Sequence, residues 1–179
     1  IVISSRYLRL KEEMPYKEAM IEALNQAFPT VVTSGTILAA AGMSIGFLSS
    51  ENTVASIGIC LGRAFAEALG DKRGITRYGQ FLLPMDETLV LVACDLSGRD
   101  YLGWSVDLPA QRVGDFDTEL GKEFFLAFVR ACPMSLHIRQ MAGENTHHIL
   151  EAVFKGAGRA LKMAVAPDEK HRDEIPSTK

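Results

Sequence analysis

The chain has 179 residues, which is enough to bury the core of one ordinary domain with or without an appendage. Its net charge is −3, and acidic and basic residues are spread through most of the sequence, so we expect no nucleic-acid partner, which usually requires a basic stripe. The three cysteines form no CxxC pair and are typical of buried thiols in a reducing compartment, which predicts a cytoplasmic protein.

Residues 1–56 are expected to form an apolar, helical segment. Residues 5–26 repeat apolar side chains at helical spacing, with a break near Pro15. The stretch 23–50 contains no charged residue, and its centre is long enough for the helix of about 20 residues that crosses a bilayer. This stretch therefore predicts either membrane association or a buried helical hairpin of a soluble domain.

The downstream sequence alternates between helical and strand patterns. From Gln80, apolar runs of strand length are bounded by Pro, Gly and Asp, and "DLSGRDYL" is typical of a hairpin turn between two strands. The order β-β-β-α-β-α predicts an α+β fold at 57–179, with helices packed on one face of a mostly antiparallel sheet and an all-helical segment before it. The expected helices cover 52–70, 117–132 and 146–165, and a further strand covers 134–143.

Two adjacent histidines open the last of these helices. On a helix, residues i and i+4 share a face, whereas neighbours diverge by about 100°. His147 and Glu151 could therefore bind one cation, while His148 would face a second cation or a substrate. Imidazole and carboxylate suit divalent Mn, Fe, Co, Ni or Zn, and each ion would need further ligands from elsewhere. The alternative is a polar helix edge that binds no metal.

Several basic residues and a serine form a second candidate site, for phosphate, because Arg supplies fork-shaped donors and Lys a point charge. The alternative for Lys155 is an ordinary helix ion pair with Glu151, four residues earlier. The candidate phosphate ligands are Arg77, Arg99, Lys155, Ser177 and Lys179.

Four segments, in this order, resemble imidazoleglycerol-phosphate dehydratase of histidine biosynthesis: "LGDKRGITRYGQFLLPMDETLVLVACDLSGRDYLGW", "RVGDFDTEL", "LHIRQMAGENTHHILEAVFKGAGRALKMAV" and "IPSTK". The resemblance runs from about residue 57 to 179. It implies a carbon–oxygen lyase that dehydrates imidazole glycerol phosphate, a homo-oligomer built of trimers, and active sites between subunits that each hold two Mn²⁺ ions.

The resemblance also implies roles for individual residues. Glu123 occupies a position where many members of the family carry a further ligand histidine. The implied metal ligands are His147, His148, Glu151 and Glu123, and the implied substrate-phosphate ligands are Arg77, Arg99, Lys155, Ser177 and Lys179.

The sequence departs from this family upstream. At the upstream positions where the resemblance implies another histidine pair and glutamate, the chain has Glu51, Asn52 and Ala55. Residues of about 1–63 resemble instead a membrane segment of an MMPL/RND-type transporter, and the two resemblances overlap at "IGICLGR". The sequence thus predicts a chimera with units 1–56 and 57–179. Three alternatives remain: a lyase, a non-catalytic fragment, and a membrane-associated fragment fused to half of a dehydratase.

Overall fold

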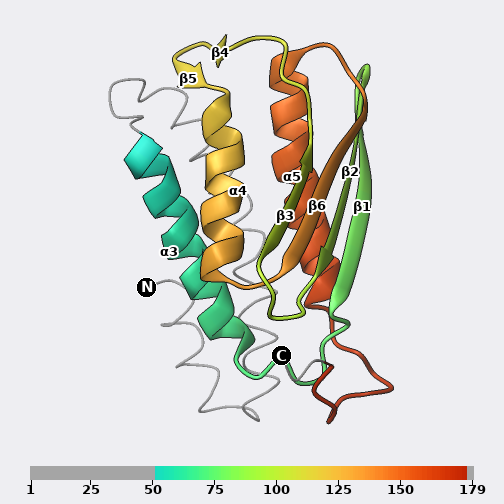
Figure 1. The fold of residues 1–179 in the computed structure, drawn as a ribbon. Helices are drawn as coiled ribbons and strands as arrows, with labels where there is room; N and C mark the ends of the chain where they lie inside the picture. Colours follow the sequence, from blue (N-terminus) through green and yellow to red (C-terminus); the bar gives the residue numbers. More distant parts are fainter. Residues whose placement is uncertain (1–50, 177–179) are drawn as a thin grey trace, which may run out of the picture.

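A computed structural model describes residues 51–176 of the chain, which form a four-stranded main sheet with three helices on one of its faces, and a separate two-stranded sheet (Figure 1). This arrangement confirms the expected α+β class. Of the expected helical segment 1–56, residues 1–50, which include the apolar stretch 23–50, lie outside the described residues. The elements are α3 (Glu51–Leu69), β1 (Tyr78–Met85), β2 (Thr88–Asp95), β3 (Tyr101–Ser105), β4 (Arg112–Val113), β5 (Phe116–Asp117), α4 (Glu119–Ala131), β6 (Ser135–Ala142) and α5 (Thr146–Ala164).

The strands of the main sheet follow the order β1-β2-β6-β3. β1 pairs with β2, and β2 with β6, in antiparallel fashion, whereas β3 and β6 are parallel. A parallel pair needs a crossover connection, and α4 supplies it. β6 therefore lies between β2 and β3, so the predicted hairpin at "DLSGRDYL" was wrong: this loop leads from one strand to another that is not its neighbour.

The core lies between the inner face of the sheet and the helices. β2 alternates strictly between buried and half-buried residues, as a strand does when one face packs on a core. Val90 and Val92 of β2 meet Leu136 and Ile138 of β6 there, and each is at most 1% exposed. Val153 of α5 is completely buried against the same cluster. Burial of these apolar side chains is the main stabilising contribution to the fold.

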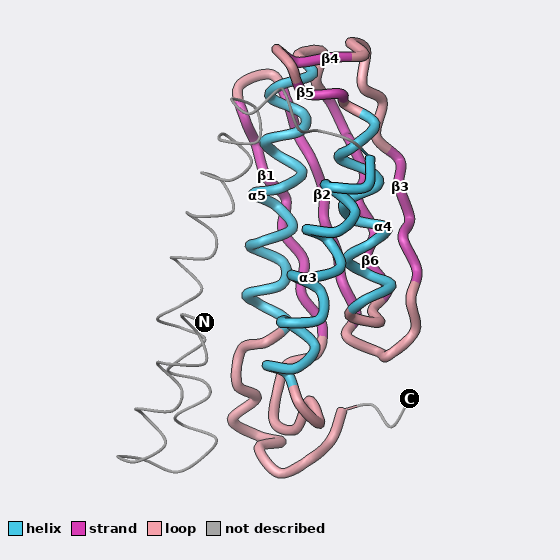
Figure 2. Tube along the Cα trace, turned by 90° about the vertical axis from the view of Figure 1, so that its left-hand side faces the viewer, coloured by secondary structure: helices cyan, strands magenta, loops and turns pink. Residues whose placement is uncertain are grey.

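The three helices have different partners. α5 lies along β1 and β2, and α3 packs chiefly against α4 (Figures 1 and 2). The contact of α5 with β1 depends on Gly79, because a Cβ atom there would come within 1.9 Å of the Ala160 carbonyl oxygen. The absence of a side chain at this position thus allows the helix to lie directly on the strand.

Within residues 51–176, no helix combines the length and the apolar character needed to cross a bilayer. The membrane association predicted for 23–50 concerns residues outside this part of the chain.

Candidate metal-binding site

Asn145 caps the N-terminus of α5 and so places the two histidines in its first turn. The Asn145 side-chain oxygen accepts hydrogen bonds from the backbone N–H groups of His147 at 3.0 Å and His148 at 3.2 Å. Asparagine is among the best residues for this capping position, because its oxygen satisfies N–H groups that have no partner within the helix. The sequence carries this signal, since Asn145 directly precedes the predicted helix.

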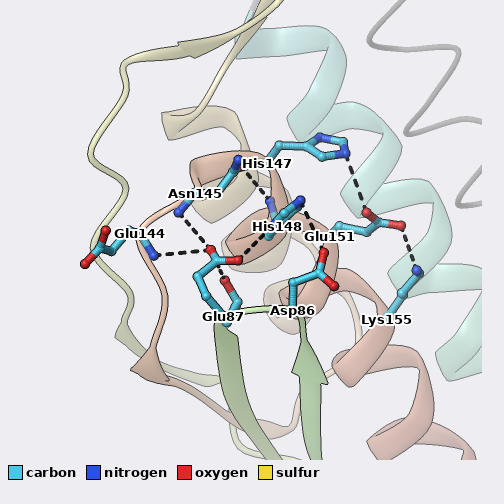
Figure 3. A network of polar contacts seen from close by, with 9 residues as sticks. Asp86, Glu87, Glu144, Asn145, His147, His148, Glu151 and Lys155 are labelled. Carbon is cyan, nitrogen blue, oxygen red and sulfur yellow. Dashed lines mark hydrogen bonds and ion pairs between the residues drawn. The ribbon is translucent and has the colours of Figure 1, made fainter.

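The turn between β1 and β2 brings two acidic residues to the same place (Figure 3). Met85 pairs with Thr88, so Asp86 and Glu87 form the two-residue loop of this hairpin. The Glu87 Oε2 atom lies 2.9 Å from His148 Nδ1, and the Asp86 Oδ2 atom lies 3.8 Å from His148 Nε2. The site therefore includes a second element, which the local spacing on the histidine helix did not reveal.

The carboxylate of Glu87 is also held by its other oxygen. Its Oε1 atom accepts hydrogen bonds from the Thr88 hydroxyl at 2.9 Å, the Asn145 N–H at 3.0 Å and the Glu144 N–H at 3.4 Å. Hydrogen bonds from His148 and then from the Asn145 backbone lower the pKa of Glu87 to about 2. The hydrogen bond to Glu87 in turn raises the pKa of His148.

His147 faces a different partner. Its Nε2 atom lies 3.5 Å from Glu151 Oε2, so these i and i+4 neighbours do share a face of α5. The two imidazole rings are inclined by 57° to each other, with 6.1 Å between their centroids. The other oxygen of Glu151, Oε1, pairs with Lys155 Nζ at 2.6 Å, which is the ordinary helix ion pair foreseen as the alternative for this lysine.

The two histidines lie beside different carboxylates, so they could hold two different cations. Cation–ligand bonds of about 2.1 Å allow one ion to reach both His147 Nε2 and Glu151 Oε2 across their 3.5 Å separation. The donors are imidazole nitrogen and carboxylate oxygen, a set that accepts Mn²⁺ among other divalent ions. In residues 51–176, no three His, Cys, Asp or Glu side chains are grouped closely enough to bind one metal ion. Additional ligands would have to come from the rest of the chain or from another copy.

The remaining candidate residues are not brought to this place. Glu123 is exposed on α4 and belongs to no such group within the described part of the chain. Arg77 precedes β1, at the opposite end of the sheet, and its guanidinium binds Asp95 through Nε at 2.6 Å and Nη2 at 3.2 Å. These contacts raise the pKa of Arg77, and its Nη1 also donates to the Pro176 carbonyl.

Arg99 is exposed in the loop after β2, whose last residue Asp95 pairs with Tyr78 at the start of β1. Arg77 and Arg99 therefore lie at one end of the sheet. The histidines lie beside the turn at the other end (Figure 3). The eight residues of β1 separate the two ends by about 25 Å, at about 3.3 Å per residue. Ser177 and Lys179 lie outside the described residues.

Comparison with known proteins places the chain in a family. The model of the imidazoleglycerol-phosphate dehydratase family matches residues 36–161. The imidazoleglycerol-phosphate dehydratase of Moorella thermoacetica is 54% identical over 132 residues, covering 74% of this chain and 67% of the relative. The protein of the same name from Dinoroseobacter shibae is 52% identical over 132 residues, covering 74% of the chain and 68% of the relative.

Solved structures of imidazoleglycerol-phosphate dehydratases also superpose on this chain. The imidazoleglycerol-phosphate dehydratase of Staphylococcus aureus superposes with a TM-score of 0.65 and 43% identity, covering 66% of this chain and 69% of that one. The Pyrococcus furiosus protein, in complex with (S)-C348, gives a TM-score of 0.63 and 39% identity, covering 72% of this chain and 69% of the other. The present chain thus spans about two thirds of the length of its relatives.

These relatives give no support to the predicted transporter resemblance of residues 1–63. The family match begins at residue 36, which lies inside that segment and upstream of the expected boundary at 57. The match continues to residue 161 and so includes α4, β6 and the capped histidine pair of α5. The chain belongs to the imidazoleglycerol-phosphate dehydratase family.

Proposed function

We propose that the chain is a cytoplasmic lyase subunit that removes water from imidazole glycerol phosphate at a site with two Mn²⁺ ions. The observation that carries this proposal is the capped start of α5, where two histidines diverge and Glu151 lies 3.5 Å from one of them. His147 and Glu151 would hold one ion and His148 the other, with Glu123 as a further candidate ligand from α4. Bound Mn²⁺ would stabilise the negative charge that develops on the imidazole of the substrate.

The candidate phosphate ligands support an assembly of at least two copies. A small phosphate ester cannot span the distance of about 25 Å between Arg77 and the histidines of the same chain. If both groups act on one substrate, different copies must supply them. We therefore propose a homo-oligomer in which Arg77 and Arg99 approach the metal-binding end of a neighbouring copy.

The roles of the individual phosphate ligands follow from their chemistry. Arg77 is fixed by Asp95 and by the Pro176 carbonyl, so its guanidinium is held in place before a ligand arrives. Lys155 lies two turns after His147 on α5, so it belongs to the metal-binding end of its own copy. Ser177 and Lys179 follow Pro176 in the sequence, and the Pro176 carbonyl accepts a hydrogen bond from Arg77. They would add a hydroxyl and an ammonium donor.

A specific observation favours the non-catalytic alternative. Glu51, Asn52 and Ala55 occupy the positions where the resemblance implies a second histidine pair and glutamate. The three ligands implied at these upstream positions are thus replaced, and a dinuclear site needs ligands for both ions. In this alternative the domain folds and binds metal at the α5 histidines without turning over the substrate.

The two functions are distinguished by an assay for the reaction. The full chain is incubated with Mn²⁺ and imidazole glycerol phosphate, and the ketone formed by dehydration of the vicinal diol is followed by NMR. The lyase proposal predicts product with the wild-type chain and only background with His148→Ala. Absence of product from a folded, Mn²⁺-loaded wild-type chain would overturn the lyase proposal in favour of the non-catalytic alternative.

A further inference from the structure

The contact between Glu87 and His148 suggests a role for the β1–β2 turn. We propose that Glu87 is a positioning residue, which keeps the imidazole proton of His148 on Nδ1 and presents Nε2 to the metal. This inference rests on the proposed function, because it assumes that His148 binds a metal ion. It adds a residue that comes from another element and lies 61 positions from the histidine in the sequence.

The direction of the hydrogen bond follows from the chemistry of the two groups. An ionised carboxylate can only accept hydrogen bonds, so His148 Nδ1 must donate across the 2.9 Å contact with Glu87 Oε2. A neutral imidazole has one N–H and one lone pair, so a proton on Nδ1 leaves the lone pair on Nε2. Metal-binding histidines very often donate their second ring N–H to a carboxylate in this way.

The other ring nitrogen is available for a ligand. His148 Nε2 lies 3.8 Å from Asp86 Oδ2, which is too long for a hydrogen bond. The Asp86 side chain is 77% exposed, so it does not close off this side of the ring. Within residues 51–176, the turn thus fixes Nδ1 of His148 by a hydrogen bond and leaves Nε2 without one.

Glu87 is suited to this task because its own position is fixed. Three donors hold its Oε1 atom, namely the Thr88 hydroxyl and the N–H groups of Glu144 and Asn145. Two of these donors belong to the segment that enters α5, so the same carboxylate ties the β1–β2 turn to the helix that carries His148. Fixing a metal ligand through a second layer of hydrogen bonds lowers the cost of ordering it on binding.

Close packing beneath the turn strengthens the connection. Gly143, just before the segment, has φ 130°, and a Cβ atom there would come within 2.5 Å of the Thr88 hydroxyl oxygen. A glycine is therefore required for the chain to pass this close to Thr88, which is only 1% exposed. The entry to α5 and the start of β2 are thus held together by backbone geometry as well as by Glu87.

His147 has a different environment, which makes the proposal specific. The carboxylate beside His147 is that of Glu151 on its own helix, 3.5 Å from Nε2, rather than that of Glu87. A change at Glu87 should therefore weaken the ion bound by His148 and have little effect on the ion bound by His147 and Glu151.

The test compares Glu87→Gln with wild-type protein and with the control Glu144→Gln. The control removes a charge from the adjacent loop between β6 and α5, at a carboxylate that points away from the histidines (Figure 3). Nitrogen-15 NMR of the metal-free protein, at a pH where the imidazoles are neutral, reports the tautomer of His148. Equilibrium dialysis with MnCl₂ then measures the affinity for Mn²⁺.

We expect His148 to carry its proton on Nδ1 in wild-type and Glu144→Gln protein, and to shift toward the Nε2–H tautomer in Glu87→Gln. Affinity for one of two Mn²⁺ ions should fall by about 10- to 100-fold in Glu87→Gln only. An unchanged tautomer and an unchanged affinity in folded Glu87→Gln would overturn the positioning role. If the wild-type protein binds no Mn²⁺, the proposed function fails, while the NMR comparison still decides whether Glu87 sets the tautomer.

Discussion

Replacing Gly79 by alanine tests how the sheet positions the helix that carries the histidines. The new methyl carbon would lie 1.9 Å from the Ala160 carbonyl oxygen and 2.8 Å from the Ala164 nitrogen, both in the last turns of α5. Since Cβ contacts below 3.0 Å are essentially not seen, β1 and α5 must separate by about 1 Å. Both obstacles are backbone atoms, so rotation of a side chain cannot relieve the overlap.

Overpacking of a core costs about 1–3 kcal/mol, and the rigid obstacle places Gly79→Ala at about 3 kcal/mol or more. For a chain of this size, that loss lowers the midpoint of thermal unfolding by about 6–12 °C. Circular dichroism on heating measures the midpoint. The matched control is Gly121→Ala on α4, where the new methyl would meet only the flexible end of Leu150, at 3.0 Å, and where alanine is the better helix former. Equal midpoints for the two variants would refute the claim that α5 rests directly on β1.

Further predictions concern the ion pair and the thiols. The pKa of His148 is raised above its ordinary value of 6.5, so its pairing stabilises the folded state fully below pH 6.5 and less as the pH rises through the raised value. The pKa of Glu87 is lowered from 4.5 to about 2, so its contribution is present above pH 4.5 and is lost as the pH falls toward 2. The difference in unfolding midpoint between metal-free wild-type and Glu87→Gln protein should thus be largest between pH 4.5 and 6.5, and a difference independent of pH would contradict the ion pair. Burial raises the pKa of Cys94 to about 12 and of Cys132 to about 11, whereas Cys60 is exposed, so a thiol reagent should label one cysteine in the native chain and three after unfolding.

Local sequence patterns were sufficient to predict how the side chains at the start of α5 are oriented. His147 and Glu151 lie four residues apart, so helical periodicity alone places them on one face and directs His148 elsewhere. The N-terminal cap at Asn145 could also have been read from its position before the helix. Each of these inferences depends only on residues within one turn of each other.

The contribution of Glu87 could not be predicted in this way. Its contact with His148 joins positions that are 61 residues apart, and it exists only because β1 and β2 form a hairpin whose turn meets the start of α5. The predicted hairpin at "DLSGRDYL" failed for a related reason. The segment does change direction between strands, but nothing in its own residues shows that β6 lies between them.

The separation of the candidate phosphate ligands also depends on topology. Arg77 follows a turn at one end of β1, and its backbone has the left-handed φ of 73°, which is uncommon for a residue other than glycine. The sequence shows neither this conformation nor the ion pair with Asp95. Asp95 is the last residue of β2 and lies beside the first residue of β1. Only the strand register places Arg77 and the histidines at opposite ends of the sheet.

The most direct test of the account is the metal content of purified, dialysed protein, measured by mass spectrometry beside the His147→Ala/His148→Ala double variant. We predict about one to two Mn per wild-type chain and none in the folded double variant, because the histidines at the start of α5 supply the nitrogen ligands. A purified, dialysed wild-type protein without bound Mn, or a double variant that retains it, would contradict the proposed metal site.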